Sequence, residues 1–172
     1  MVDVAGGNGT HLAAILAADG RLSGTLADTA KGLSEAPAVL NEAGVADRCT
    51  MTVSDVFEAV PAGGDLYLVK NVLPDWHDED CARILRNCRE AMAPDGAVKI
   101  IASMAPEDPR AADRGQMTAV SFFDISLMTL TTGRERTLGE YEELLAKAGF
   151  RLRDAAPIAD TAMYHEITAV AA

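Results

Sequence analysis

The alternation of short apolar runs with helical patterns constrains the fold of this chain more than any other feature. Five β-type runs alternate with segments whose apolar residues recur at helical spacing. The expected strands are residues 1–5, 23–28, 49–55, 63–72 and 97–103, and the expected helices are residues 9–19, 30–44, 78–92, 113–133 and 137–150. Strands that alternate with helices form mostly parallel sheets with helices on both faces. We therefore expect an α/β fold with a doubly wound, mostly parallel sheet.

The last third of the chain adds an antiparallel edge to this expectation. Residues 151–159 and 164–171 resemble a closing pair of strands with no helix between them. The helix before them is expected to have Thr137 as its N-cap and Gly149 as its C-cap. Pro37 should interrupt the helical region over residues 30–44. Rossmann-like sheets of this kind bind ligands beyond the carboxyl ends of the strands, where the strand order reverses.

Composition limits the classes of partner and site. The chain has 172 residues with a net charge of −11, so we expect one domain over residues 1–172 that binds neither nucleic acid nor acidic membranes. No signal peptide or long apolar span is evident, and a cytoplasmic location is expected. The three cysteines are too few and too irregularly spaced for a disulfide framework, and no ligand-spaced histidines accompany them. Buried thiols rather than a metal pair are the prediction for Cys81 and Cys88, which lie two helical turns apart.

The turn after the first expected strand carries glycines that suit a ligand, although glycines also mark plain turns. Gly6, Gly7 and Gly9 remove side chains where the backbone must turn tightly. Asp28 ends the second strand about twenty residues later, where nucleotide-binding folds place a carboxylate for the two ribose hydroxyls. Leu12 occupies the place of the third glycine of the dinucleotide motif, which a pyrophosphate requires. The spacing therefore favours S-adenosylmethionine over NAD.

Several segments carry a resemblance to a known family. In sequence order they are "VDVAGGNGT", "GTLAD", "VSDVFEAVPAGGDLYLVKNVLPDW", "RILRNCREAMAPDG" and "GRERTLGEYEELLAKAGF". They resemble the catalytic domain of small-molecule O-methyltransferases, which comprise plant phenylpropanoid enzymes and actinobacterial relatives in polyketide and antibiotic pathways. The resemblance implies a class I methyltransferase fold. It also implies S-adenosylmethionine-dependent methyl transfer to a hydroxyl of an aromatic or polyketide-type small molecule.

The resemblance also implies roles for individual residues. The implied cofactor-binding residues are Asp3 and Gly7 for the methionine part, Asp28 for the ribose, Asp55 and Val56 for the adenine, and Lys70 at the end of the fourth strand. The implied acceptor-binding residues are Asp124 and Met128, although a helix-face acid and a core methionine are equally ordinary interpretations.

Three positions depart from the family pattern. Ala5 replaces the first glycine of the usual triplet, and alanine resists positive φ. Pro74 stands where plant members and many bacterial members have the histidine that takes the proton from the acceptor. Ala102 replaces a glutamate that orients this histidine, whereas the second supporting acid is kept as Glu135. His77 is a possible replacement base, and a surface residue beside a helix cap is the alternative interpretation.

These departures leave three functions open. An acidic phenol needs no base, so methyl transfer by proximity is the leading hypothesis. A methyltransferase-like hydroxylase or cyclase is the second, and an inactive cofactor-binding subunit is the third. Family members also carry an N-terminal helical domain, whereas this sequence begins at its first strand. We therefore expect a homo-oligomer or a partner chain that supplies this domain. Phe122 and Phe123 would contact it or pack on the sheet.

Overall fold

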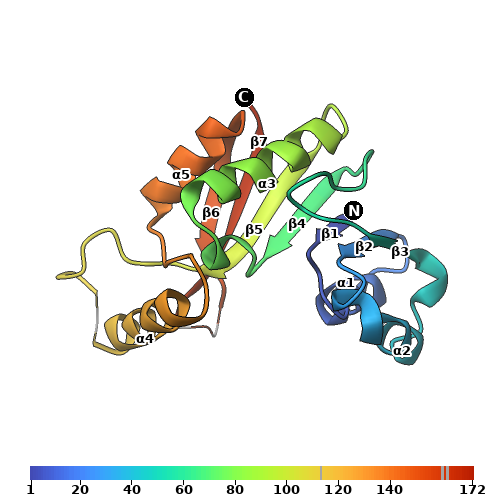
Figure 1. Cartoon of the computed structure of the whole chain (residues 1–172), viewed down its shortest axis with the longest axis horizontal. Coiled ribbons are helices and arrows are strands. Elements are labelled where there is room, and N and C mark those ends of the chain that lie inside the picture. Colours follow the sequence, from blue (N-terminus) through green and yellow to red (C-terminus); the bar gives the residue numbers. More distant parts are fainter. Residues whose placement is uncertain (113, 160, 162) are drawn as a thin grey trace.

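A seven-stranded sheet forms the centre of the protein. The structure is a computed structural model, which describes residues 1–112, 114–159, 161 and 163–172. The strands follow one another across the sheet in the order β3-β2-β1-β4-β5-β7-β6 (Figure 1). Their bounds are β1 Val2–Val4, β2 Gly24–Asp28, β3 Cys49–Val53, β4 Leu66–Lys70, β5 Ala97–Ser103, β6 Phe150–Pro157 and β7 Tyr164–Ala171.

The pairing of these strands confirms the predicted fold class. Strands β1 to β5 pair in parallel, whereas β7 is antiparallel to both β5 and β6. The strand order reverses between β1 and β4, because the chain proceeds outward from β1 to β3 and then returns to the other side of β1. Ligands of such sheets bind beyond the carboxyl ends of the strands at this reversal.

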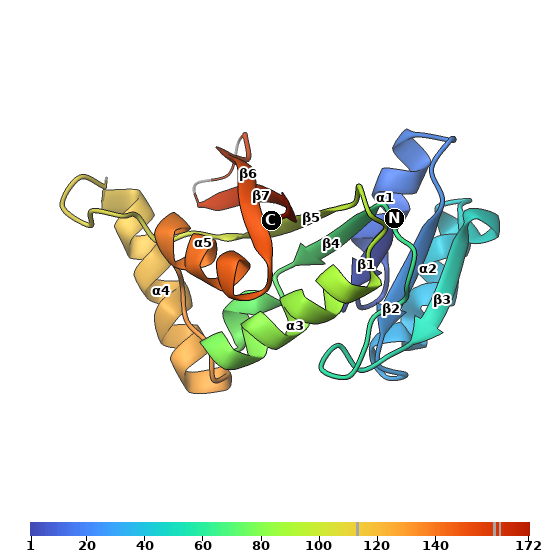
Figure 2. The ribbon, with the colours of Figure 1, turned by 90° about the horizontal axis from the view of Figure 1, so that it is seen from above.

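Helices cover the two faces of the sheet unequally. Their bounds are α1 Thr10–Ala18, α2 Ala36–Glu42, α3 Asp78–Ala91, α4 Arg114–Leu130 and α5 Leu138–Lys147, with short 3-10 helices at Gly32–Glu35, Ala46–Arg48 and Leu73–Asp75. Helices α3 and α5 bury the main core against one face, whereas α1 and α2 enclose a smaller core around β2 (Figures 1 and 2). Helix α4 lies apart from both layers, beside the carboxyl-end edge of β5.

Three of the predicted boundaries that differ in the structure have a clear physical cause. Strand β4 ends at Lys70 rather than at residue 72, because Asn71 adopts a φ of 54°, which turns the chain out of the strand. The helical region over residues 30–44 divides before Pro37, which lies in the first turn of α2, where a missing backbone N–H costs nothing. The C-cap of α5 is Ala148, and Gly149 follows it with a φ of 81°.

The start of α5 and the buried thiols follow the predictions. Thr137 Oγ1 accepts a hydrogen bond from Glu140 N at 3.3 Å, and Glu140 Oε2 accepts one from Thr137 N at 2.9 Å, which is a capping box. Cys81 and Cys88 are fully buried, and burial raises the pKa of their thiols to about 11 and about 12. They are therefore packing residues rather than nucleophiles.

Two kinds of feature are absent from the described part of the chain. None of its helices combines the length and the apolar character that crossing a membrane requires. Within the same residues, no three histidine, cysteine or acidic side chains gather closely enough to hold a metal ion.

Candidate active site

Asp3 lies at the strand-order reversal, beneath the glycine turn. Its side chain is buried, and Oδ2 has no hydrogen-bond partner within the described residues. Gly6 passes so close that a Cβ atom at this position would collide with the Asp3 carboxyl group. Burial raises the pKa of Asp3 to about 7, with the positive charge of Lys70 opposing this shift and the negative charge of Asp28 adding to it. The turn thus holds a carboxyl group that lacks a partner.

Asp28 ties the glycine turn to the end of β2. Its Oδ2 accepts a hydrogen bond from Gly7 N at 2.8 Å, and its Oδ1 accepts one from Thr29 N at 2.6 Å and one from Thr29 Oγ1 at 3.1 Å. A carboxylate has about four acceptor positions, so capacity remains for a ligand hydroxyl. A Cβ atom at Gly32 would collide with this carboxylate, which explains the glycine there.

Ala5 supports the predicted strain in this turn, because its φ is 52° and alanine disfavours this region. We expect Ala5→Gly to raise the free energy of unfolding by about 1 kcal/mol. Glycine removes the cost of the left-handed conformation, and the greater entropy of the unfolded glycine chain offsets part of this gain. The exposed mid-helix Ala14 is the matched control, since Ala14→Gly should lower it by about 1 kcal/mol. Urea titrations of the two variants measure both changes. Equal losses in both would show that Ala5 carries no strain.

Asp55 lies two residues beyond β3 rather than at its end. Its Oδ1 accepts a hydrogen bond from Phe57 N at 2.9 Å, which fixes a tight turn. The Val56 carbonyl accepts a hydrogen bond from Asn87 Nδ2 at 2.7 Å, so α3 supports this turn. The Phe57 ring meets Trp76 edge to face, with centroids 4.8 Å apart. The turn therefore contacts the segment that follows Pro74.

A cavity of about 300 Å³ includes Asn71 in its lining. Asn71 directly follows Lys70, the residue whose positive charge acts on Asp3. The cavity walls combine an apolar part with several polar groups, as small-molecule sites do. The apolar wall consists of Pro74, Phe123 and Leu127, and the polar lining consists of Asn71, Asp75, Ser103, Glu135 and Tyr164.

Glu135 is the most deeply buried acid of this cavity. Its Oε1 accepts a hydrogen bond from Ser103 Oγ at 2.6 Å, and its Oε2 is buried without a partner in the described structure. Burial raises the pKa of Glu135, and the negative charge of Asp124 adds to this shift, whereas the Ser103 hydrogen bond opposes it. Asp124 Oδ1 also accepts a hydrogen bond from Glu135 N at 2.9 Å. A carboxyl group in this environment suits proton transfer.

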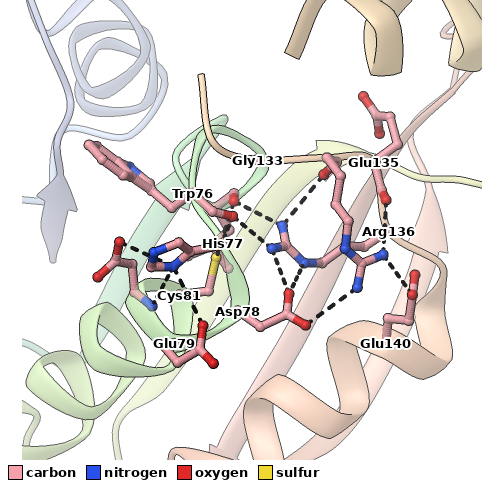
Figure 3. Close-up of polar contacts among 12 residues, drawn as sticks. Trp76, His77, Asp78, Glu79, Cys81, Gly133, Glu135, Arg136 and Glu140 are labelled. Atoms are coloured by element: carbon pink, nitrogen blue, oxygen red, sulfur yellow. Dashed lines mark hydrogen bonds and ion pairs between the residues drawn. The ribbon is translucent and has the colours of Figure 1, made fainter. Parts of the chain in front are cut away.

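Arg136 joins the segment around Pro74 to the segment that carries Glu135 (Figure 3). Its fully buried guanidinium donates to Asp78 Oδ1 from Nε at 3.1 Å and from Nη2 at 2.8 Å. Nη1 donates to the Leu73 carbonyl at 3.0 Å, and Nη2 donates to the Trp76 carbonyl at 2.7 Å. These carbonyls bracket Pro74 and Asp75, so Arg136 fixes that segment relative to its neighbour Glu135.

The structure brings some of the predicted catalytic and acceptor-binding residues together but separates others. Glu135 lines the cavity, and Asp124 accepts a hydrogen bond from its backbone N–H without being part of the described lining. His77 is instead the half-exposed N-cap of α3, with Nδ1 accepting from Asp80 N at 3.4 Å (Figure 3). Met128 is 71% exposed on α4, and the cavity is lined instead by its neighbour Leu127. The catalytic role of His77 and the acceptor role of Met128 stay predictions without support from this geometry.

Sequence reasoning did not identify Asn71, Ser103 and Tyr164 as cavity residues. Asn71 Nδ2 donates to the Tyr164 hydroxyl at 3.2 Å, and Tyr164 is the cross-strand partner of Ser103. The positive φ of Asn71 directly after a buried strand is a mark of a functional position, but φ is not visible in a sequence. The other two residues meet only through the antiparallel register of β5 and β7.

The buried Asp3 should make stability depend on pH. The unfolded chain releases this proton near the ordinary pKa of 3.8, whereas the folded chain keeps it up to about pH 7. Stability therefore falls as pH rises between these values. From about pH 5 to about pH 6.5, we expect this group to cost about 2 kcal/mol, a cost that Asp3→Asn removes. Urea titrations across this range give the difference, and the exposed Asp95→Asn should keep the original profile. Parallel profiles for Asp3→Asn and the unchanged protein would contradict the assignment.

Comparison with known proteins identifies the family. The O-methyltransferase domain family matches residues 1–151. The chain is 40% identical over 156 residues to "Mitomycin biosynthesis 6-O-methyltransferase" of Streptomyces lavendulae, an alignment that covers 91% of this chain and 43% of that protein. It is 35% identical to "O-demethylpuromycin-O-methyltransferase" of Streptomyces alboniger, covering 88% of this chain and 39% of that protein. The chain therefore spans less than half the length of these curated relatives.

A solved structure agrees with the sequence comparison. The neocarzinostatin-biosynthesis O-methyltransferase NcsB1, crystallised with S-adenosylmethionine and 2-hydroxy-5-methyl naphthoic acid, superposes with a TM-score of 0.87 at 34% identity. The superposition covers 99% of this chain and 48% of that one. The family match over most of the chain and the shared architecture show that this chain belongs to the O-methyltransferase domain family.

Proposed function

We propose that this chain is the cofactor-binding and catalytic part of an S-adenosylmethionine-dependent O-methyltransferase. The acceptor is a hydroxyl group of an aromatic or polyketide-type small molecule in secondary metabolism. The observation that carries the proposal is that the cofactor-binding residues adjoin the acceptor cavity in the chain. Lys70, whose charge acts on Asp3, is followed directly by Asn71, which lines the cavity. The relatives named as O-methyltransferases of antibiotic pathways support the same reaction.

The residues at the carboxyl edge fit this cofactor. Asp28 accepts from a ribose hydroxyl through its remaining acceptor position, while its existing bond to Gly7 N holds the turn in place. Asp55 and Val56 lie on the tight turn beside β3 and frame the adenine. Asp3, whose buried Oδ2 lacks a partner, accepts from the ammonium group of the methionine part. When bound, S-adenosylmethionine supplies an electrophilic methyl group.

The cavity residues position the acceptor and take its proton. Phe123 and Leu127 provide apolar walls for a ring, and Pro74 offers no proton-accepting group. The Glu135 carboxylate accepts the proton of the acceptor hydroxyl as the oxygen attacks the methyl carbon, and the carbon–sulfur bond breaks with its electron pair passing to sulfur. S-adenosylhomocysteine leaves as the second product. The protein accelerates the reaction by orientation and by this proton transfer.

Methyl transfer from isotope-labelled S-adenosylmethionine to a panel of neutral phenols tests the proposal. Labelled ether products, identified by mass spectrometry, are the expected result. Cofactor binding without transfer to any member of the panel would favour the hydroxylase, cyclase or inactive-subunit alternatives. Assembly with a second copy or with a chain that supplies a helical N-terminal half stays a prediction, as does a cytoplasmic location. The exposed Phe122 and Phe123, at 67% and 40%, do not pack into the core.

A further inference from the structure

Acidic groups dominate the polar lining of the acceptor cavity. Asp75 and Glu135 both line it. Asp124 is bonded to Glu135, because it accepts a hydrogen bond from the Glu135 backbone N–H. Within the described lining of this cavity, no side chain carries a positive charge. The cavity therefore presents a negative potential to whatever molecule enters it.

The two arginines next to Glu135 in the sequence are not among the residues that line the cavity. The Arg136 guanidinium is enclosed by Asp78 and by backbone carbonyls, and Arg134 donates to Glu140 Oε1 at 2.6 Å and to Asp78 Oδ2 at 3.4 Å (Figure 3). Arg136 has no exposed surface. Neither arginine can neutralise an anionic acceptor without breaking this network.

One carboxylate oxygen of Glu135 has no hydrogen-bond donor in the described structure, and a ligand could supply one. The residue lines the cavity and is only 6% exposed, and its Oε2 is buried without a hydrogen-bond partner in the described structure. A buried acceptor atom without a donor is costly, so a ligand N–H or O–H group gains by filling the position. A ligand carboxylate gains nothing there and is repelled.

We propose that this cavity selects aromatic acceptors that bear a hydroxyl group and an adjacent amino group, and that it rejects ring carboxylates. The proposal rests on the proposed function, since it names the substrate class of the same site. Glu135 accepts from the reacting hydroxyl, and Asp75 accepts from the neighbouring amino group. The apolar wall of Phe123 and Leu127 contacts the ring and is indifferent to charge.

Matched naphthalenes test this selectivity without requiring methyl transfer. Binding of 3-amino-2-naphthol, 2-naphthol and 3-hydroxy-2-naphthoate is followed by their fluorescence, with S-adenosylhomocysteine present at about pH 8, where ordinary carboxyl groups are ionised. We expect the amino compound to bind at least about 30-fold more tightly than the carboxylate, with 2-naphthol between them. Equal affinities, tighter binding of the carboxylate, or binding of none of the three would overturn the proposal.

Variants assign the discrimination to the named acids. Asp75→Asn and Glu135→Gln should each reduce the preference about tenfold or more, mainly because the carboxylate binds better. Glu143→Gln, on the exposed face of α5, should keep the preference of the unchanged protein. An unaltered preference in both cavity variants, with folding verified by circular dichroism, would overturn the assignment. A protein that discriminates among the probes but transfers no methyl group would contradict the proposed function alone.

Discussion

Replacement of Arg136 by leucine should lower the free energy of unfolding by about 3–5 kcal/mol, because buried carbonyl groups would lose a charged donor. Arg136 donates to the carbonyls of Leu73 and Trp76 and to Asp78, and leucine can replace none of these bonds. Water cannot take over readily, since the arginine has no exposed surface. Urea denaturation followed by circular dichroism measures the change.

The neighbouring arginine provides the control. Arg134 is 41% exposed and pairs with Glu140 and Asp78 at the surface. Surface ion pairs contribute little, so Arg134→Leu should cost about 1 kcal/mol or less. Similar losses in the two variants would show that the buried carbonyls are not the source of the effect. A loss below about 1 kcal/mol for Arg136→Leu would show that the carbonyls find other donors.

Replacement of Glu135 by glutamine should lower the kcat of methyl transfer to a neutral phenol about 1,000-fold, within the usual contribution of a general base. Glutamine has the same shape and can still accept the Ser103 hydroxyl bond, so the fold should persist. The KM for the acceptor should change much less than kcat, because the lost interaction acts on the proton in transit. Steady-state kinetics with labelled cofactor separate the two constants.

The acidity of the acceptor and the pH provide the controls. A nitrophenol that is already ionised needs no base, so Glu135→Gln should cost less than about tenfold with this acceptor. Because burial raises the pKa of Glu135, the activity of the unchanged protein should fall as pH decreases and the carboxylate becomes protonated. The variant should lose this dependence. Equal kcat values for a neutral phenol in both proteins would leave proximity alone as the source of catalysis.

The sequence predicts the sheet well because its strands are recognisable from local pattern. Tyr67, Leu68 and Val69 are buried on both faces, as a continuous apolar run in a parallel sheet requires. Asp28 was identifiable because its distance from the glycine turn follows from the strand–helix–strand unit itself. The strand-order reversal at β1 and β4 then brings Asp3, Asp28 and Lys70 together.

The acceptor side was less predictable because its contacts join distant segments. Arg136 lies in a charged run between helices, a pattern that indicates an exposed residue. It is nevertheless fully buried, and it donates to the carbonyl of Trp76, which lies 60 residues earlier in the chain. Tyr164 meets Ser103 only through the register of an antiparallel pair. His77 illustrates the converse, because its interpretation as a surface residue beside a helix cap needs only local sequence, and the structure has it as the N-cap of α3.

Calorimetric titration with S-adenosylmethionine tests the central claim, a working cofactor site at the carboxyl edge of the sheet, most directly. We expect micromolar binding by the unchanged protein and a loss of at least about 100-fold in Asp28→Ala, which removes hydrogen bonds to a charged acceptor. Glu143→Ala, an equal change of charge on the exposed face of α5, should bind as the unchanged protein does. Absence of binding by the folded, unchanged protein, or equal binding by Asp28→Ala, would contradict the claim.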